Sequence, residues 1–202
     1  MTSPITGLPA GIRPLMDNLQ YRQELHDRIF HSDIYTLAKP ERLKHLVLHQ
    51  FKYISRIYGA SRDVSRKENM TRIRKQSIDG FIVVLSMMNV CNSLVMDHLR
   101  FTSMKIEGCL DEGIRSVGQL AKIVEDMDHL ASNSPTIKIR EECLNLLNVF
   151  LNLLVISGLS LKLVPAQALD RLIEVEKQNI HFERHEAEIL RLTQNMEVPT
   201  QG

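Results

Sequence analysis

The chain has 202 residues, 44% of them apolar, and a formal net charge of +1. That length fits one domain, or one pair of fused repeats, with a sizeable buried core. The balanced charge gives no global field that would attract nucleic acid or an anionic membrane, which argues against both as partners.

Helical spacing of apolar residues dominates the chain, and the sparse glycines and prolines lie near the expected helix ends. Pro40 suits the first turn of a helix, and Gly158 suits a left-handed cap. In chain order, the pattern predicts helices over residues 13–30, 40–58, 70–94, 97–108, 111–131, 136–157 and 165–194. The apolar stripe of the second helix comprises Leu43, Leu46, Val47, Phe51, Ile54 and Ile57. No strand pattern of comparable length occurs, so the sequence predicts an all-α fold.

Residues 144–161 contain no charged side chain and must be considered as a membrane span. Asn145, Asn148 and Asn152 are spaced to share one helical face, where three amides would be costly in hydrocarbon. We therefore expect a buried bundle helix whose amides are hydrogen-bonded by neighbouring helices. The N-terminus lacks a signal-peptide pattern. The three cysteines, at 91, 109 and 143, have no metal-type spacing, so we expect a cytoplasmic protein.

An offset of 66 residues aligns two helix pairs of the chain without a gap. It places Leu48 over Ile114, and Leu85 over Leu151. A degenerate duplication explains this better than chance similarity between amphipathic helices, and packing the two pairs together would bury a four-helix core. The expected organisation is an N-terminal tail and helix (1–39), a first repeat (40–100), a second repeat (101–162) and a C-terminal amphipathic helix with a tail (163–202).

Two segments of the second repeat carry a family resemblance. The segment IRSVGQLAKIVED (114–126) resembles the first motif helix, Glu-Glu-x-Gly-Glu-Leu, of the MazG-like all-α nucleoside triphosphate pyrophosphohydrolases. The segment IREECLNLL (139–147) resembles their second, Glu-x-x-Asp, helix. The resemblance covers roughly residues 40–180 and implies a bundle of two repeated helix pairs with flanking terminal helices. It also implies carboxylates that hold magnesium ions, which clamp a triphosphate and activate water.

Most of those carboxylates are replaced in this chain. The first motif's two acids fall on Gln50 and Tyr53 in the first repeat, and on Ser116 and Gln119 in the second. The second motif's pair falls on Gln76 and Asp79, and on Glu142 and Asn145. We therefore expect a catalytically degenerate member without a cofactor, acting by protein or nucleotide binding. The alternative is an active magnesium-dependent pyrophosphohydrolase, with Asp79, Glu141, Glu142 and His49 as candidate catalytic residues.

Two further clusters of polar residues could bind a ligand. Glu41, His45 and His49 recur every four residues and could hold a transition metal, although a polar stripe is the simpler interpretation and no metal is expected. The connector between the second and third helices is basic, so it could bind the phosphates of a nucleotide. It could also bind the phosphates of a nucleic-acid backbone, which would make the protein a nucleic-acid-binding module. Its candidate residues are Arg62, Arg66, Lys67, Arg72, Arg74 and Lys75. The amphipathic terminal helices could dock a protein partner or a second copy.

Overall fold

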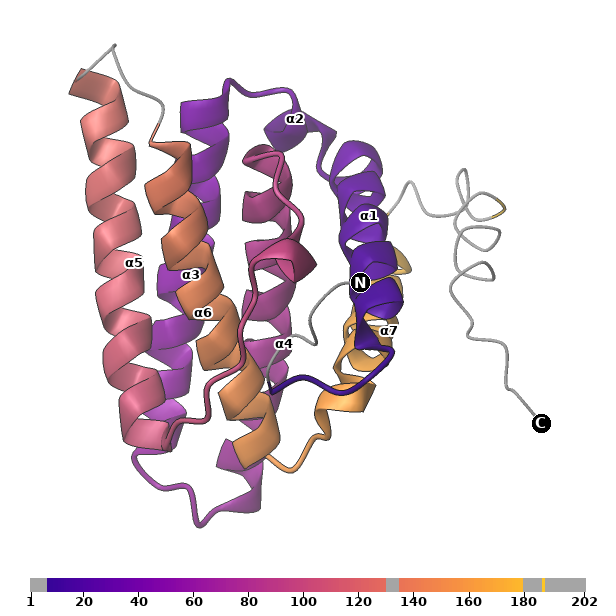
Figure 1. The fold of residues 1–202 in the computed structure, drawn as a ribbon, viewed down its shortest axis with the longest axis vertical. Coiled ribbons are helices and arrows are strands. Elements are labelled where there is room, and N and C mark those ends of the chain that lie inside the picture. Colours follow the sequence, from indigo (N-terminus) through magenta and orange to yellow (C-terminus); the bar gives the residue numbers. More distant parts are fainter. Residues whose placement is uncertain (1–6, 130–134, 180–186, 188–202) are drawn as a thin grey trace.

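A computed structural model of the protein describes residues 7–129, 135–179 and 187. These residues form helices and no strand, which confirms the all-α prediction. The helices are α1 (Ile12–Phe30), α2 (Ser32–Tyr35), α3 (Lys39–Ser61), α4 (Lys67–Val90), α5 (Ile106–His129), α6 (Thr136–Ile156) and α7 (Val164–Glu176), with 3-10 turns η1 (Val95–Asp97) and η2 (Leu161–Leu163). Figure 1 shows the long helices standing side by side.

Helices α3, α4, α5 and α6 form a four-helix bundle in which α3 packs against α4 and α5, and α6 packs against the same two helices. Helices α3 and α5 run in opposite directions (Figure 1). The bundle centre is apolar, and Leu43, Phe81, Leu120 and Phe150 are fully buried in it. Removal of this apolar surface from water is the main stabilising contribution to the bundle.

Two glycines let the bundle helices approach closely. A Cβ atom on Gly80 of α4 would lie 2.4 Å from the Phe150 ring of α6, and one on Gly113 of α5 would lie 2.9 Å from Ile54 of α3. Such distances are shorter than van der Waals contact. The absence of a side chain at these positions therefore determines how closely α4 approaches α6 and how closely α5 approaches α3.

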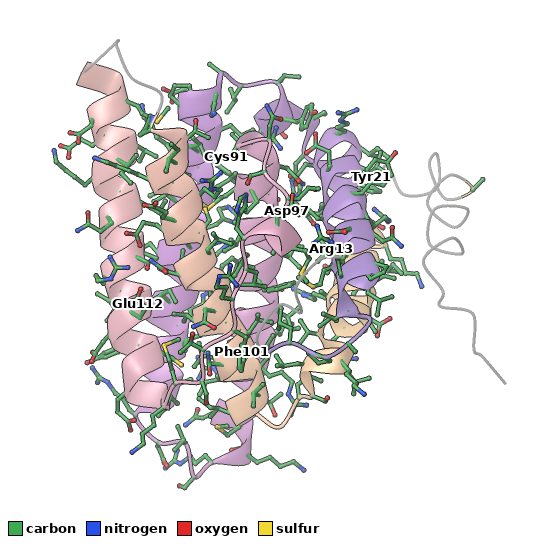
Figure 2. The ribbon with its side chains drawn as sticks, in the orientation of Figure 1. Arg13, Tyr21, Cys91, Asp97, Phe101 and Glu112 are labelled. Atoms are coloured by element: carbon green, nitrogen blue, oxygen red, sulfur yellow. The ribbon has the colours of Figure 1, made fainter. Side chains whose placement is uncertain are left out.

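Helices α1 and α7 lie side by side at one edge of the bundle, and both pack against α4 (Figure 1). The buried face of α1 is unusually polar, because Gln20, Arg22, Gln23 and His26 are all nearly inaccessible to solvent. Arg13 at the start of α1 forms an ion pair with Asp97 of η1 (Figure 2). Buried polar groups need partners, so this edge of the molecule is where specific polar contacts concentrate.

The predicted helix over residues 97–108 is wrong. Its residues form the end of η1 and an extended connector, and α5 begins only at Ile106. The reason is tertiary: Asn148 and Asn152 of α6 exchange hydrogen bonds with the backbone of Thr102, and Asn152 also accepts one from Met104 N–H at 2.8 Å. These bonds replace the ones that a helix would have supplied.

The other predicted helices are observed, with boundaries shifted by a few residues. The last described helix, α7, ends at Glu176, and most of the predicted range from 177 to 194 lies outside the described residues. Phe51 belongs to the predicted apolar stripe of α3, yet 64% of its surface is exposed. It lies at the edge of that stripe, on a side of α3 that the described helices leave uncovered, whereas Ile54 and Ile57 farther along the helix are buried in the core.

In the part of the chain that the structure describes, no single helix is long and apolar enough to cross a membrane. Helix α6 and the segment Leu161–Glu176 together meet the same test of length and composition, but they are bent by 114° relative to each other.

Candidate functional site

A cavity of about 370 Å³ lies between α1, α3, α4 and α7. That volume falls within the range of roughly 300–1,000 Å³ that is typical of small-molecule sites. Its apolar wall comprises Ile34, Leu46, Ile82, Val83, Leu172 and Val175. Its polar and charged wall comprises Gln23, His26, Asp27, His31, Tyr35, Arg42, His45, His49, Tyr53, Asp79, Ser86, Arg171 and Gln178.

A hydrogen-bonded network crosses the cavity wall between α1, α3 and α4. The Gln23 amide donates to Asp27 at 2.9 Å and to the Ser86 hydroxyl at 2.8 Å. Arg42 donates to the other oxygen of Asp27 at 3.3 Å, and its guanidinium lies 4.3 Å from the centre of the Tyr35 ring. Burial raises the pKa of Asp27, although Ser86, His26 and Arg42 oppose that shift. This end of the cavity is electrically balanced.

The wall nearest the end of α3 combines Tyr53, Asp79 and Arg171. Arg171 of α7 donates from Nε to Asp79 at 2.7 Å and lies 2.8 Å from Glu174 through Nη1. Burial, together with the Asp79 charge, raises the pKa of Tyr53 to about 12. The phenol therefore stays protonated at neutral pH.

Lys52 and Arg56 lie near this second end but outside the residues that line the cavity. The Lys52 ammonium lies 4.6 Å from the centre of the Tyr53 ring, and burial and the neighbouring Arg56 both lower its pKa. Like charges that crowd one another in this way favour an anionic partner. Lys52 and Arg56 would therefore favour an anion beside Tyr53, whereas Arg171 is already paired with Asp79 and Glu174.

Several histidine rings also line the cavity. The rings of His45 and His49 lie 4.7 Å apart, centre to centre. Burial is the main cause that lowers the pKa of His49 to about 4, and Lys52 and His45 add to it. Burial also lowers the pKa of His31. At neutral pH, His31 and His49 are therefore uncharged planar groups.

The three residues considered as a possible metal site, where no metal was expected, do not converge on one point. His45 and His49 line the cavity, whereas the exposed Glu41 forms an ion pair with Lys44 at 2.9 Å. Among the described residues, no group of three or more His, Cys, Asp or Glu side chains is arranged to hold a metal ion.

The candidate catalytic residues fall into two places. Asp79 and His49 line the same cavity. Glu141 and Glu142 lie on α6, outside that cavity, and Glu142 accepts two hydrogen bonds from Arg115 of α5 at 2.9 and 3.1 Å. The structure therefore does not bring the four candidates into one site.

The remaining positions carried over from the family motifs are used in local contacts. On α3 and α4, the Gln50 amide donates to the Gly80 carbonyl at 3.0 Å, and Gln76 accepts from Arg56 at 3.3 Å. On α5 and α6, Ser116 is fully buried and the Asn145 amide donates to Glu142 at 3.2 Å, while Gln119 is exposed.

The basic connector residues lie around the turn between α3 and α4 and outside the cavity lining. Arg74 donates to the backbone carbonyl and hydroxyl of Ser157, and Arg66 pairs with Asp63 at 2.8 Å. Arg62, Lys67, Arg72 and Lys75 are exposed. Their role in phosphate binding stays a prediction.

Sequence reasoning missed the ion pairs that support the cavity. Behind its α1 wall, Glu176 of α7 accepts from Arg22 at 2.5 Å and lies 2.9 Å from His26 Nδ1. All three side chains are buried. The spacing of Arg22 and His26, one helical turn apart, was the available signal, but the partner is 150 or more residues away in the sequence.

Comparisons of the chain with protein-family models, with curated proteins and with solved structures gave no match in any of the three. Inference about function therefore depends on the cavity and its chemistry.

Proposed function

We propose that the chain is a MazG-like helical protein that has lost hydrolysis and binds a nucleotide in the cavity between α1, α3, α4 and α7. One observation carries this proposal. Asp79, the acid retained in the second motif of the first repeat, lies in the cavity wall beside Tyr53 and is held by Arg171 at 2.7 Å. An arginine from α7 thus supplies the positive charge that a metal ion supplies in a hydrolase.

The loss of hydrolysis follows from what magnesium requires. Mg²⁺ prefers octahedral coordination by hard oxygen ligands, usually including carboxylates. The first repeat offers only Asp79, because Gln50 and Gln76 are engaged by Gly80 and Arg56. In the second repeat, Arg115 engages Glu142. Each retained acid therefore has a guanidinium partner in place of a metal ion.

The ligand class follows from the shape and charge of the cavity. From Arg42 to Tyr53, α3 extends for roughly 16 Å at 1.5 Å per residue. Lys52, beside Tyr53 of the cavity wall, suits a phosphate, and the neutral rings of His31 and His49 suit a planar base. Without a metal ion to offset its charge, a triphosphate fits this site less well than a monophosphate. A nucleoside monophosphate is the ligand we expect.

The proposal includes the internal duplication, which agrees with the burial of equivalent positions. Leu48 and Ile114, which the 66-residue offset aligns, are both more than half exposed, whereas Gln50 and Ser116 are both fully buried.

The proposed location of the protein is the cytoplasm. Its three cysteines are buried free thiols, which suits a reducing compartment.

A thermal-shift screen of nucleoside mono-, di- and triphosphates, with and without magnesium, tests the proposal. A ligand at about 100 times its Kd stabilises the folded state by about 2.7 kcal/mol. For a chain of this size, that corresponds to a rise in Tm of roughly 5–10 °C. We expect such a rise with a monophosphate, independent of magnesium, and no release of pyrophosphate from any triphosphate.

Two matched variants connect the shift to the cavity. Val83→Trp fills the cavity without removing a charge and should abolish the shift, whereas Val155→Trp, at an exposed position of α6, should retain it. Absence of a shift with every nucleotide would refute binding. Magnesium-dependent release of pyrophosphate that is lost in Asp79→Ala would establish the active enzyme instead.

A further inference from the structure

Four large apolar side chains are exposed on the outer surface of α3 and α5. Leu48, Phe51 and Tyr58 of α3 are 68%, 64% and 45% exposed, and Ile114 of α5 is 52% exposed. The three α3 residues are spaced at i, i+3 and i+10, which places them along one side of the helix. Single exposed apolar residues are ordinary, but a line of them marks an interaction surface.

The α3 and α5 residues belong to one continuous face. On α3, Phe51 lies two residues before Tyr53 and therefore about 200° around the helix from the cavity. Arg56 marks the flank that meets α4, through Gln76. On α5, Arg115 marks the flank that meets α6, through Glu142. Leu48 and Phe51 lie away from α4, and Ile114 lies away from α6, so both apolar lines border the groove where α3 packs against α5.

The two halves of this face differ in relief. Beside Ile114, at one-turn spacing along α5, come Gly118 and Ala121, which are both exposed. No described atom lies within 4 Å of the position that a Cβ on Gly118 would occupy. Next to Ile114, the α5 half is therefore low at Gly118 and Ala121, whereas the α3 half projects at Leu48 and Phe51.

The two halves also differ in charge. Around α3, Lys44 and Arg62 lie within about 20° of Phe51, whereas around α5, Glu107 and Glu125 lie within about 20° of Ile114. The helices are antiparallel (Figure 1), and Gly113 of α5 lies against Ile54 of α3, so the end of α3, which Arg62 follows, is level with the start of α5, where Glu107 lies. A two-fold rotation about an axis parallel to the helices would lay α3 of one copy on α5 of the other, with basic ends against acidic ends.

We propose that the α3–α5 face is the interface of a homodimer, in which Phe51 of each copy packs over Gly118 and Ala121 of the other. A two-fold interface requires a surface that is complementary to itself. The projecting, basic α3 half of one copy would lie against the low, acidic α5 half of the other, which meets that requirement. The interface goes beyond the proposed function and does not depend on it, since the cavity lies on the opposite flank of α3 and stays open in the dimer.

Sedimentation equilibrium of the full chain over a concentration series tests the proposal. Wild type should show a reversible monomer–dimer equilibrium. Phe51→Glu should raise the dimer dissociation constant by roughly 100-fold or more, because the buried aromatic residue occurs twice in a two-fold interface. Tyr21→Glu, at an equally exposed position of α1, is the matched control and should leave the constant unchanged.

A charge-reversal series gives the second test. Arg62→Glu and Glu107→Arg should each weaken the dimer, and the two substitutions combined should restore much of the wild-type constant. Circular dichroism would verify that each variant is folded. We expect all of them to fold, because the four substituted positions, Tyr21, Phe51, Arg62 and Glu107, are exposed. A wild type that stays monomeric at every concentration overturns the proposal, and so does a dimer that Tyr21→Glu disrupts while Phe51→Glu does not.

Discussion

Arg22 and Glu176, separated by 154 residues in the sequence, form an ion pair 2.5 Å long with both side chains buried. His26 contacts the other oxygen of the same carboxylate at 2.9 Å. Among the described residues, Arg22 Nε and Nη1 have no hydrogen-bond partner. In the buried charge pair that joins α7 to α1, the Glu176 carboxylate is therefore hydrogen-bonded through both oxygens, whereas the Arg22 guanidinium is only partly hydrogen-bonded. Desolvation of such a pair offsets much of its attraction.

Removal of one member of this pair should destabilise the protein strongly. Glu176→Ala leaves the guanidinium of Arg22 buried without its counter-charge, so the free energy of unfolding should fall by about 3–5 kcal/mol. Urea denaturation followed by circular dichroism at 222 nm, the standard helix band, measures this loss.

Removal of both charges distinguishes an unpaired charge from lost packing. The double variant Arg22→Met, Glu176→Leu retains apolar volume and leaves no charge behind, so it should lose less stability than Glu176→Ala alone. A double variant as unstable as the sum of the two single variants would contradict this account.

The helices were predictable where their contacts are local. Apolar spacing predicted α3, α4 and α6 to within a few residues of their ends, because each buries one stripe of its own surface. The same spacing could not show that Phe51 stays exposed, since a stripe indicates which residues share a face and not how far the neighbouring helices cover it. The connector before α5 was mispredicted because its backbone bonds are made by Asn148 and Asn152, about 50 residues later.

The candidate site was predictable only in fragments. Asp79 and His49 were singled out from the sequence and do line one cavity. Arg171, which decides the chemistry of Asp79, was not singled out, because it lies 92 residues away and resembles any charged residue on an amphipathic helix. Pairings of this kind depend on tertiary packing, which a single sequence does not encode in its local pattern.

Gly80 should not tolerate a side chain. Its Cβ would lie 2.4 Å from the Phe150 ring, so Gly80→Ala should separate α4 from α6 and lower the free energy of unfolding by about 1–3 kcal/mol. Gly59→Ala is the matched control, because no described atom lies within 4 Å of its Cβ position and alanine is the better helix former by about 1 kcal/mol. Thermal denaturation of both variants should therefore show opposite shifts in Tm. Equal shifts would show that packing against Phe150 is not the cause.

Asn152 should be important for the stability of the connector before α5. Its side chain accepts from Met104 N–H at 2.8 Å and donates to the Thr102 carbonyl at 2.9 Å, so Asn152→Ala should cost about 1–3 kcal/mol through the unpaired backbone groups. Hydrogen exchange at the Met104 amide should accelerate in parallel. Asn145→Ala, on the same helix, removes only a half-buried contact with Glu142 and should cost less than about 1 kcal/mol. Unchanged protection of Met104 in Asn152→Ala would contradict the assignment.

His49 should make the stability of the fold depend on pH. Its pKa is lowered from an ordinary value of 6.5 to about 4, mainly by burial. The unfolded chain therefore binds this proton more tightly than the folded chain, so stability present above pH 6.5 is lost as the pH falls toward about 4. Replacement by glutamine removes this proton, and the fall in Tm across that window should be smaller in His49→Gln than in wild type. The raised pKa of Asp27 and the lowered pKa of His31 act in both proteins and largely cancel in the difference between them. Parallel Tm curves for the two proteins would show that His49 is not a source of the acid sensitivity.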